Sequence, residues 1–203
     1  MEERDIRNGA PALGAGVFLL ARPVLDGSWF EKKIVLLMQH GNEEGALGFV
    51  VNAVVAMPVN EVIPGAARDP GRRRPVFLGG PVEPGSVRIL EFSRTEGSPA
   101  DRVRELAQAE SPEELAETLV RRLDSPSVGL FMGYSGWAPG QLEREIADGC
   151  WEVYSADPAV VLADREKLKG VTPDQFKASY PPAVVHVVEP SPREGDFGGD
   201  GGL

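Results

Sequence analysis

Histidine, cysteine and basic side chains are scarce in this chain of 203 residues. It has two histidines and one cysteine, and its 21 lysines and arginines are outnumbered by 31 aspartates and glutamates, which gives a formal charge of −10. A single cysteine excludes an internal disulfide. The negative charge repels phosphate backbones and anionic lipid headgroups, so direct nucleic-acid binding is not expected.

Long apolar runs are also missing from the sequence. Runs such as residues 34–38 fall far short of the roughly 20 apolar residues that cross a bilayer. Residues 1–5 lack the basic and then apolar order of a secretory signal. Together with the single cysteine, these features predict a cytoplasmic protein with no membrane partner.

No spacing of metal ligands or of phosphate-binding glycines occurs in the chain. It contains neither His-x-x-x-His nor Cys-x-x-Cys, and no dense pattern of acidic residues. The glycine pair Gly79-Gly80 lacks the Gly-Lys-Ser/Thr ending of a phosphate loop. We therefore expect no metal and no cofactor.

Enough hydrophobic residues, 42% of the chain, are present to build a folded core. Residues 1–12 are polar and are expected to be mobile. The last segment, 190–203, is rich in glycine and aspartate and cannot bury enough surface to order itself, so we expect a disordered tail. Residues 13–189 between them show no repeat and no long linker, which predicts a single domain.

Short apolar runs bounded by Gly, Asp and Asn predict strands at residues 16–21, 34–39 and 46–52. Their nearly continuous hydrophobicity indicates burial on both faces. The tetrapeptide 42–45 joins the second and third runs as a tight turn, so this pair is expected to be antiparallel. Further strands are predicted at 76–78, 87–92, 128–132, 151–154 and 184–188.

Two helices carry clear start signals. Ser111 offers an N-cap hydroxyl, followed by a proline and a glutamate and by leucines at intervals of four. Pro139 begins another helix, in which Leu142, Ile146 and Cys150 share one face. Weaker signals lie at 59–63 and 165–168. Strands that cluster early and helices interspersed later predict an α+β fold with a mixed or antiparallel sheet.

Three blocks of the sequence resemble one known family. They are residues 29–40 continued by 44–52, Gly79-Gly80-Pro81-Val82, and residues 133–145 with Trp151 after them. These blocks resemble the AlgH/YqgE family of uncharacterised bacterial proteins, whose name describes a transcriptional regulator. The resemblance implies one domain with a mixed, largely antiparallel sheet curled toward a barrel and flanked by helices. The chain departs from the family pattern at Ala53-Val54, where relatives often carry Arg-Pro, and no histidine follows Gly79-Gly80-Pro81.

Ser135 lies between a predicted strand and a predicted helix, the context of a hydrolase nucleophile. The glycine spacing does not fit, because Gly136 comes one residue too early for the nucleophile motif. His40 and His186 are the available imidazole bases. We therefore expect a turn in which small residues set the geometry.

The helix that begins near Pro139 directs unpaired backbone N–H groups toward Gly136 and Trp137, where a small anion can bind. Trp137 then supplies an aromatic wall, while Gln141 and Glu145, one turn apart, select polar groups of the ligand. The alternative is structural: Trp137 packs in the core and Gln141 caps neighbouring backbone.

Other polar residues are expected to have structural roles. Cys150 continues an apolar helix face and is predicted to be buried and unreactive. His40 lies beside Asn42 at a strand end, where acid–base or metal chemistry is conceivable, but a hydrogen bond to the hairpin is favoured. His186 is expected to bond locally within its strand. The basic run formed by Arg68 and residues 72–74 predicts a solvated loop, with contact to an acidic partner or nucleic acid as the alternative.

The preferred hypothesis is a regulatory or small-ligand/protein-binding domain whose partner is an unknown small molecule or protein. Its working surface joins the hairpin at residues 40–52 to the turn and helix at residues 135–145. The alternative is a hydrolase or transferase acting on a small polar metabolite, so enzymatic activity stays undecided. The candidate ligand-binding residues are His40, Asn42, Asn52, Ser135, Trp137, Gln141 and Glu145.

Overall fold

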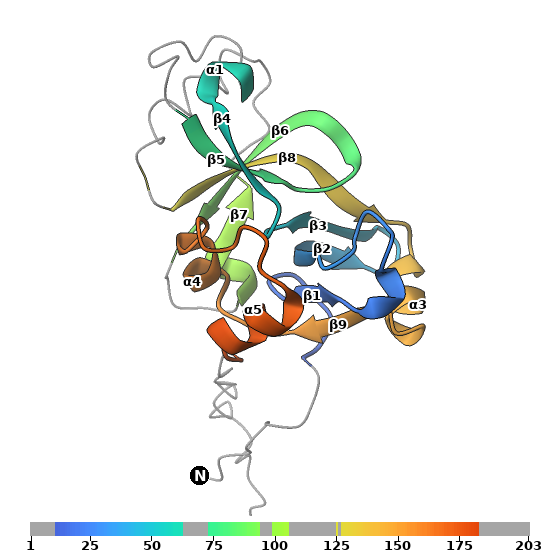
Figure 1. Cartoon of the computed structure of the whole chain (residues 1–203). Helices are drawn as coiled ribbons and strands as arrows, with labels where there is room; N and C mark the ends of the chain where they lie inside the picture. The colour runs from blue at the N-terminus through green and yellow to red at the C-terminus, as the bar shows by residue number, and fades with distance from the viewer. Residues whose placement is uncertain (1–10, 63–72, 94–98, 106–124, 126, 183–203) are drawn as a thin grey trace, which may run out of the picture.

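A single continuous β-sheet organises the described part of the computed structural model, which comprises residues 11–62, 73–93, 99–105, 125 and 127–182 (Figure 1). Its order is β4-β5-β8-β3-β2-β1-β9, and β6 pairs with β8 and β7. The described strands are β1 Phe18–Ala21, β2 Ile34–Gly41, β3 Gly45–Val50, β4 Val54–Pro58, β5 Arg73–Leu78, β6 Val82–Phe92, β7 Val103–Glu105, β8 Val128–Trp137 and β9 Trp151–Tyr154.

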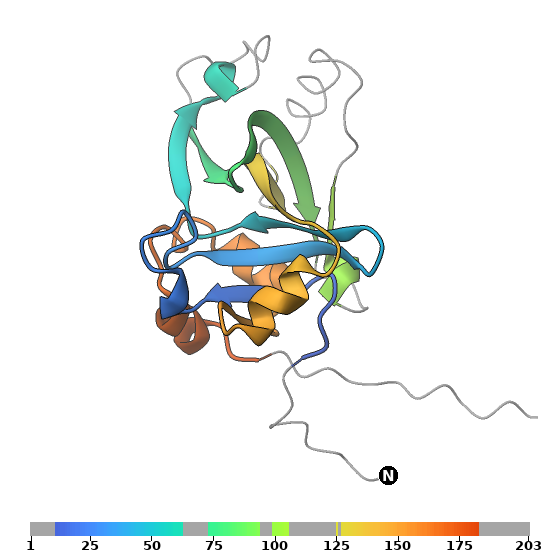
Figure 2. The ribbon, with the colours of Figure 1, turned by 90° about the vertical axis from the view of Figure 1, so that its right-hand side faces the viewer.

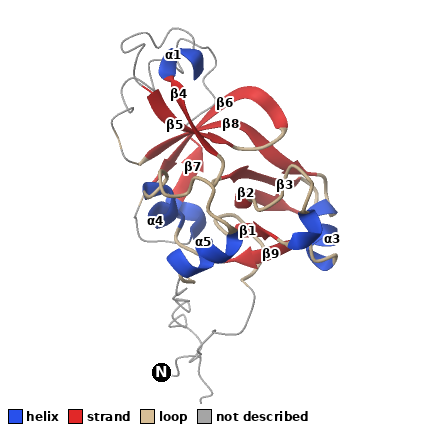
Figure 3. Ribbon diagram, in the orientation of Figure 1, coloured by secondary structure: helices blue, strands red, loops and turns tan. Residues whose placement is uncertain are grey.

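Short helices flank this sheet (Figure 3). They are α1 Val59–Val62, α3 Gln141–Ala147, α4 Pro158–Ala163 and α5 Pro173–Ser179, with 3-10 turns η1 Pro23–Leu25 and η2 Pro99–Arg102. Among the described strands β5 and β8 form the parallel pair and the other pairs are antiparallel, so the sheet is mixed and largely antiparallel, as predicted. The sheet curls into a half-barrel, which confirms the α+β class. Within the described residues, no helix has the length and apolar character needed to cross a bilayer.

Most sequence-based elements are confirmed. The β2–β3 hairpin closes with Gly41 opposite Gly45, and α1 and α3 lie where helices are expected. The helix predicted at 165–168 is wrong, because these residues form turns after α4. Leu168 is instead fully buried in the core. Four elements were not predicted from the apolar periodicity: β4, β7, α4 and α5, each seven residues long or shorter.

Three predictions concern residues that the structure describes in part or not at all. The helix predicted from Ser111 and the strand predicted at 184–188, with His186, lie outside the described residues. Arg73 and Arg74 begin β5, opposite Pro58 and Met57 of β4, so the expectation of a loop is wrong for them. Residues 68 and 72 of the same basic run are not described.

Both faces of the β9-β1-β2-β3 part of the sheet are buried, which explains the continuous hydrophobic runs. On one face Phe18, Leu36 and Phe49 pack with Phe176 of α5 and Leu162 of α4. The opposite face packs against α3 and two tryptophans. Figure 2 views the molecule toward α3, which lies in front of β1 and β2. Residues buried on this second face include Leu19, Val35, Leu37, Ala46, Val50, Trp137, Leu142 and Trp151.

The chain crosses β8 at Gly79 and Gly80. It passes there from β5, which pairs with β8 in parallel, to β6, which pairs with β8 antiparallel. The N–H of Gly79 donates to the carbonyl of Met132 over 2.7 Å, and its carbonyl accepts from Val50 N–H over 2.8 Å. A Cβ on Gly80 would lie 2.1 Å from the backbone of Tyr134. The glycine pair is therefore required by a close backbone crossing.

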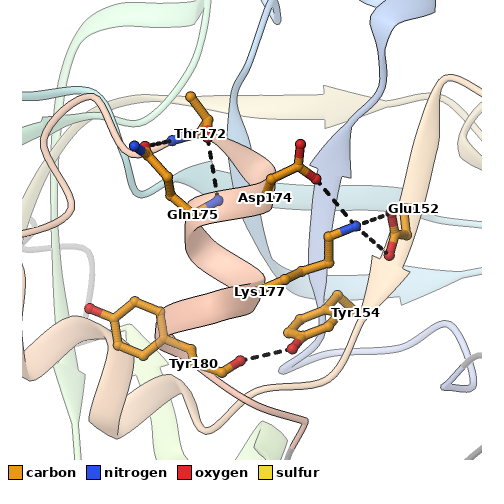
Figure 4. A network of polar contacts seen from close by, with 7 residues as sticks. All are labelled: Glu152, Tyr154, Thr172, Asp174, Gln175, Lys177 and Tyr180. Carbon is orange, nitrogen blue, oxygen red and sulfur yellow. Dashed lines mark hydrogen bonds and ion pairs between the residues drawn. The ribbon is translucent and has the colours of Figure 1, made fainter.

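Polar contacts hold α5 against the sheet (Figure 4). Thr172 caps the helix, with Gln175 completing the capping box. The ammonium group of Lys177 lies 3.0 Å from the carboxylate of Glu152 on β9. The hydroxyl of Tyr154 donates to the carbonyl of Tyr180 over 2.8 Å. These contacts fix the C-terminal helix on the face of the sheet opposite to α3.

Candidate functional site

Helix α3 brings most of the candidate residues together. Gly140, with φ of 71°, precedes the first helical residue. The side-chain oxygen of Gln141 accepts a hydrogen bond from Ala138 N–H over 3.1 Å and so satisfies one unpaired donor at the helix start. Leu142 is buried and Ile146 packs beside it on the sheet, so Glu145 is turned toward the sheet margin.

The carboxylate of Glu145 accepts three hydrogen bonds. One oxygen accepts from the indole nitrogens of Trp137 and Trp151, each over 2.8 Å. The other oxygen accepts from the side-chain amide of Gln141 over 2.8 Å. This carboxylate therefore fixes two buried indole rings and the helix start at once.

Four aromatic rings form a series of contacts that includes the two indoles bonded to this carboxylate. The rings of Trp137 and Trp151 meet edge to face with centroids 5.9 Å apart, and Phe30 contacts both. Trp29 follows with an edge contact to Phe30 and is 43% exposed. Trp137 therefore packs in the core and Gln141 caps a neighbouring backbone N–H, as the structural alternative for these residues states. Ligand binding by these two residues stays a prediction.

His40 contacts the same helix. Its Nε2 atom lies 2.7 Å from Oε1 of Glu143, although 103 positions separate the two residues in the chain. The expectation that His40 bonds to the hairpin is wrong. Within the hairpin, Gln39 and Glu44 bond to each other instead.

A β-bulge explains why His40 faces α3. Leu37 pairs with Gly48 but Gln39 pairs with Leu47, so one residue is inserted in β2 between these pairs. His40 then pairs with Ala46, whose side chain is on the face covered by α3. Regular alternation would have turned His40 to the opposite face.

The carboxylate of Glu143 is held in its charged form. A hydrogen bond from its own backbone N–H and the contact with His40 keep the pKa of Glu143 below its ordinary value. The His40 side chain is 16% exposed and that of Glu143 is 41% exposed. The pair therefore lies at the solvent boundary of the sheet. Glu143 carries no sequence signal beyond its position within the block that resembles the family.

Ser135 does not lie in a turn, contrary to expectation. It belongs to β8, where it pairs with Gly48 of β3, and it is fully buried. Its hydroxyl donates to the carbonyl of Gly79 over 3.1 Å and supports the crossing of β8. In the described part of the chain, no hydrogen bond joins Ser135 to His40 or Glu145.

Asn52 is placed away from the other candidates. Its amide accepts from Ile34 N–H at the start of β2 and donates to the carbonyls of Lys32 and Val171. His40 lies six residues along β2 from Ile34, about 20 Å at strand spacing. Asn42, by contrast, is exposed in the hairpin turn near His40.

Cys150 packs partly buried beside the second core face, as expected for a structural thiol. Burial is the main cause that raises its pKa, with Glu145 and Asp148 adding to the effect. Such a thiol is a poor nucleophile near neutral pH. A search of the described residues finds no group of three or more His, Cys, Asp or Glu side chains placed to hold a metal ion.

Comparison with known proteins agrees with this architecture. The family model described as AlgH-like matches residues 18–170. The chain belongs to the AlgH-like family. A UPF0301 protein of Streptomyces avermitilis is 35% identical over 160 residues, covering 72% of this chain and 77% of the relative. A UPF0301 protein of Anaeromyxobacter sp. (strain Fw109-5) is 40% identical over 153 residues, covering 70% and 76%.

Two solved structures share the AlgH-like fold with this chain. The solution structure of the AlgH protein from Pseudomonas aeruginosa aligns with a TM-score of 0.56 at 20% identity, covering 85% of this chain and 89% of that one. A crystal structure of a Corynebacterium diphtheriae protein aligns with a TM-score of 0.54 at 24% identity, covering 72% and 78%. At these identities the likeness establishes the fold of this AlgH-like domain and carries no conclusion on activity.

Proposed function

We propose that this AlgH-like domain is a regulatory domain that binds a small polar molecule at its hairpin–helix surface. This surface consists of His40 and Asn42 from the β2–β3 hairpin and Gln141, Glu143 and Glu145 from α3. The observation that carries the proposal is the 2.7 Å contact between His40 and Glu143. It joins two elements distant in sequence at a partly exposed polar position.

The surface combines a rigid base with polar groups that reach solvent. Three hydrogen bonds fix Glu145, two of them donated by buried indole rings. His40, Glu143 and Gln141 keep partial exposure, and Asn42 is exposed. Side chains held in place by packing and partners lose less conformational freedom on binding, which favours recognition.

A ligand-observed NMR screen of the full chain tests the proposal. The compounds are free amino acids, nucleosides, sugars and small carboxylic acids. The His40→Gln variant is expected to bind any hit about five- to tenfold more weakly, because one hydrogen bond of about 1–1.5 kcal/mol is lost. Asn60→Gln, an exposed change in α1 at the other end of the molecule, is the matched control (Figure 1).

Two results would contradict the binding proposal. One is the absence of any hit among the polar compounds. The other is a hit that binds wild type and His40→Gln equally well. Loss of binding in His40→Gln together with unchanged thermal stability in both variants is the supporting result.

The regulatory part of the proposal concerns the cell. We place the domain in the cytoplasm, where the single cysteine stays reduced. A chromosomal His40→Gln change is expected to reproduce the effect of deleting the whole protein while its level in the cell stays constant. We also propose that no direct DNA contact is involved, so the purified chain should not be retained on duplex DNA even at low salt.

Catalysis is the second candidate, and the same His40–Glu143 pair is the observation that favours it. A carboxylate that orients an imidazole is a common device of general-base catalysis. Of the three side chains considered for chemistry, Ser135 is fully buried and Glu145 accepts three hydrogen bonds, which leaves His40. Turnover of a hit from the screen, abolished in His40→Gln, would favour a hydrolase or transferase over a binding domain.

A further inference from the structure

The contact with Glu143 determines which nitrogen of His40 carries the proton. An ionised carboxylate only accepts hydrogen bonds. The pKa of Glu143 is lowered by its backbone N–H and by His40, so the carboxylate is charged near neutral pH. Nε2 of His40, 2.7 Å from that carboxylate, must then carry a hydrogen and donate it. In the neutral ring this leaves the lone pair on Nδ1.

Nδ1 of His40 reaches solvent. Among the described residues it has no hydrogen-bond partner, because the contact of His40 runs through Nε2. The Nε atom of Arg102 is the one side-chain nitrogen or oxygen of the described chain that is buried without a partner. Nδ1 is not in that condition, so it is not fully shielded from solvent, and the His40 side chain as a whole is 16% exposed.

The direction of the imidazole is fixed as well. The β-bulge between Leu37 and Gln39 turns His40 onto the α3 side, and Glu143 holds the ring from the helix. A ring held at one nitrogen presents the other in a constant position. Such an arrangement, a carboxylate on one nitrogen and a free lone pair on the other, is the one that sets tautomer and orientation in histidine sites.

We propose that His40 acts through Nδ1 as a hydrogen-bond acceptor and that Glu143 is its positioning residue. Because Nδ1 accepts a hydrogen bond, the ligand must donate one. It is therefore a molecule that presents an amide, amine or hydroxyl hydrogen to the site, rather than one with acceptors alone. This inference rests on the proposed binding role of the hairpin–helix surface and names the chemistry of its ligand.

The tautomer is measurable on the ligand-free full chain by long-range ¹H–¹⁵N NMR of the imidazole groups. The chain has two histidines, so a His186→Gln variant assigns the His40 signals. In the neutral ring, Nε2 is expected at a protonated and Nδ1 at an unprotonated shift. Glu143→Gln is expected to move both shifts toward the average of a freely exchanging ring, with tryptophan fluorescence unchanged as evidence of an intact fold.

A matched pair of neutral probes tests the ligand class. Acetamide carries N–H donors, whereas N,N-dimethylacetamide offers the same carbonyl without them. Acetamide is expected to shift the Nδ1 signal of His40 toward the protonated value, and dimethylacetamide to leave it in place. Equal responses to both probes, or no response to acetamide, would overturn the assignment of the ligand class.

The tautomer measurement and the binding test with His40→Gln together separate this inference from the binding proposal. An Nδ1-protonated ring in the free protein refutes the acceptor role even if His40→Gln abolishes binding of a screened compound. The expected tautomer with undiminished binding in His40→Gln refutes the binding proposal instead.

Discussion

The indole nitrogen of Trp151 donates a hydrogen bond to the carboxylate of Glu145 over 2.8 Å, so the first residue of β9 is tied back to the helix that precedes it. The same oxygen accepts from Trp137, the last residue of β8. One carboxylate therefore connects the end of one strand, a helix and the start of the next strand. It is the polar centre of a largely apolar interface.

Replacing Glu145 by alanine is expected to cost about 2–4 kcal/mol of unfolding free energy, because two buried indole N–H groups and the Gln141 amide lose their acceptor. Glu145→Gln keeps one oxygen and should cost less. Urea unfolding followed by tryptophan fluorescence measures both. The control is Glu166→Ala, an exposed change outside α3 that should shift stability by less than about 0.5 kcal/mol.

Asn52→Asp is expected to destabilise the fold by about 3 kcal/mol or more. The substitution removes the two N–H donors that face the carbonyls of Lys32 and Val171 and places a charge beside them. Asn60→Asp, on an exposed residue of α1, makes the same chemical change without burial. Equal midpoints of urea unfolding for the two variants would show that the Asn52 amide is not a structural link.

Much of the fold follows from local sequence. The β2–β3 hairpin and α3 are predicted correctly, because a glycine-containing turn between apolar runs and a proline before an amphipathic segment are strong local signals. The helix predicted at 165–168 is wrong because its apolar residue, Leu168, is buried although it lies in a turn. Apolar spacing alone does not distinguish the two cases.

The candidate site was predictable only in part, because its geometry depends on contacts between distant segments. Local patterning predicted that His40, Gln141 and Glu145 share one surface. It gave no means of seeing the bulge in β2 that turns His40 toward Glu143. It also placed Ser135 in a turn, since the crossing of β8 by Gly79, which buries that hydroxyl, is a property of the tertiary fold.

Gly80→Ala is expected to prevent stable folding, with a loss above about 4 kcal/mol. A methyl group there would lie 2.1 Å from backbone atoms of Tyr134, and neither of the two backbone segments can move without breaking the sheet. Gly85→Ala, in the irregular stretch of β6 between Val82 and Val87, has open space and is the matched control. Soluble yield and the midpoint of thermal unfolding compare the two, and a well-folded Gly80→Ala protein would contradict the close crossing.

Acid should remove the stabilising effect of Glu143. Because the folded pKa of this carboxylate is below its unfolded value, its contribution is present above the unfolded pKa and is lost as the pH falls through the folded pKa. The difference in unfolding midpoint between wild type and Glu143→Gln is therefore expected near pH 6 and should vanish at strongly acidic pH. A difference that stays constant across this range would rule out the charged form as its source.

Alkaline pH should weaken the attachment of α5. The pKa of Lys177 is raised by its bond to Glu152, and burial raises the pKa of Tyr154 and of Tyr180. A raised folded pKa means that the stabilising contribution is complete below the unfolded pKa, about 10 for these side chains, and is lost as the pH rises through the folded value.

Lys177→Gln removes one of the three contributions, so its stability should fall less steeply between neutral pH and pH 11 than that of wild type. Urea unfolding at several pH values measures this slope, and Lys167→Gln, whose exposed ammonium group contacts Asp164 outside α5, should keep the wild-type slope. If the Lys177→Gln and wild-type slopes coincide, the Lys177–Glu152 pair contributes nothing to the docking of α5.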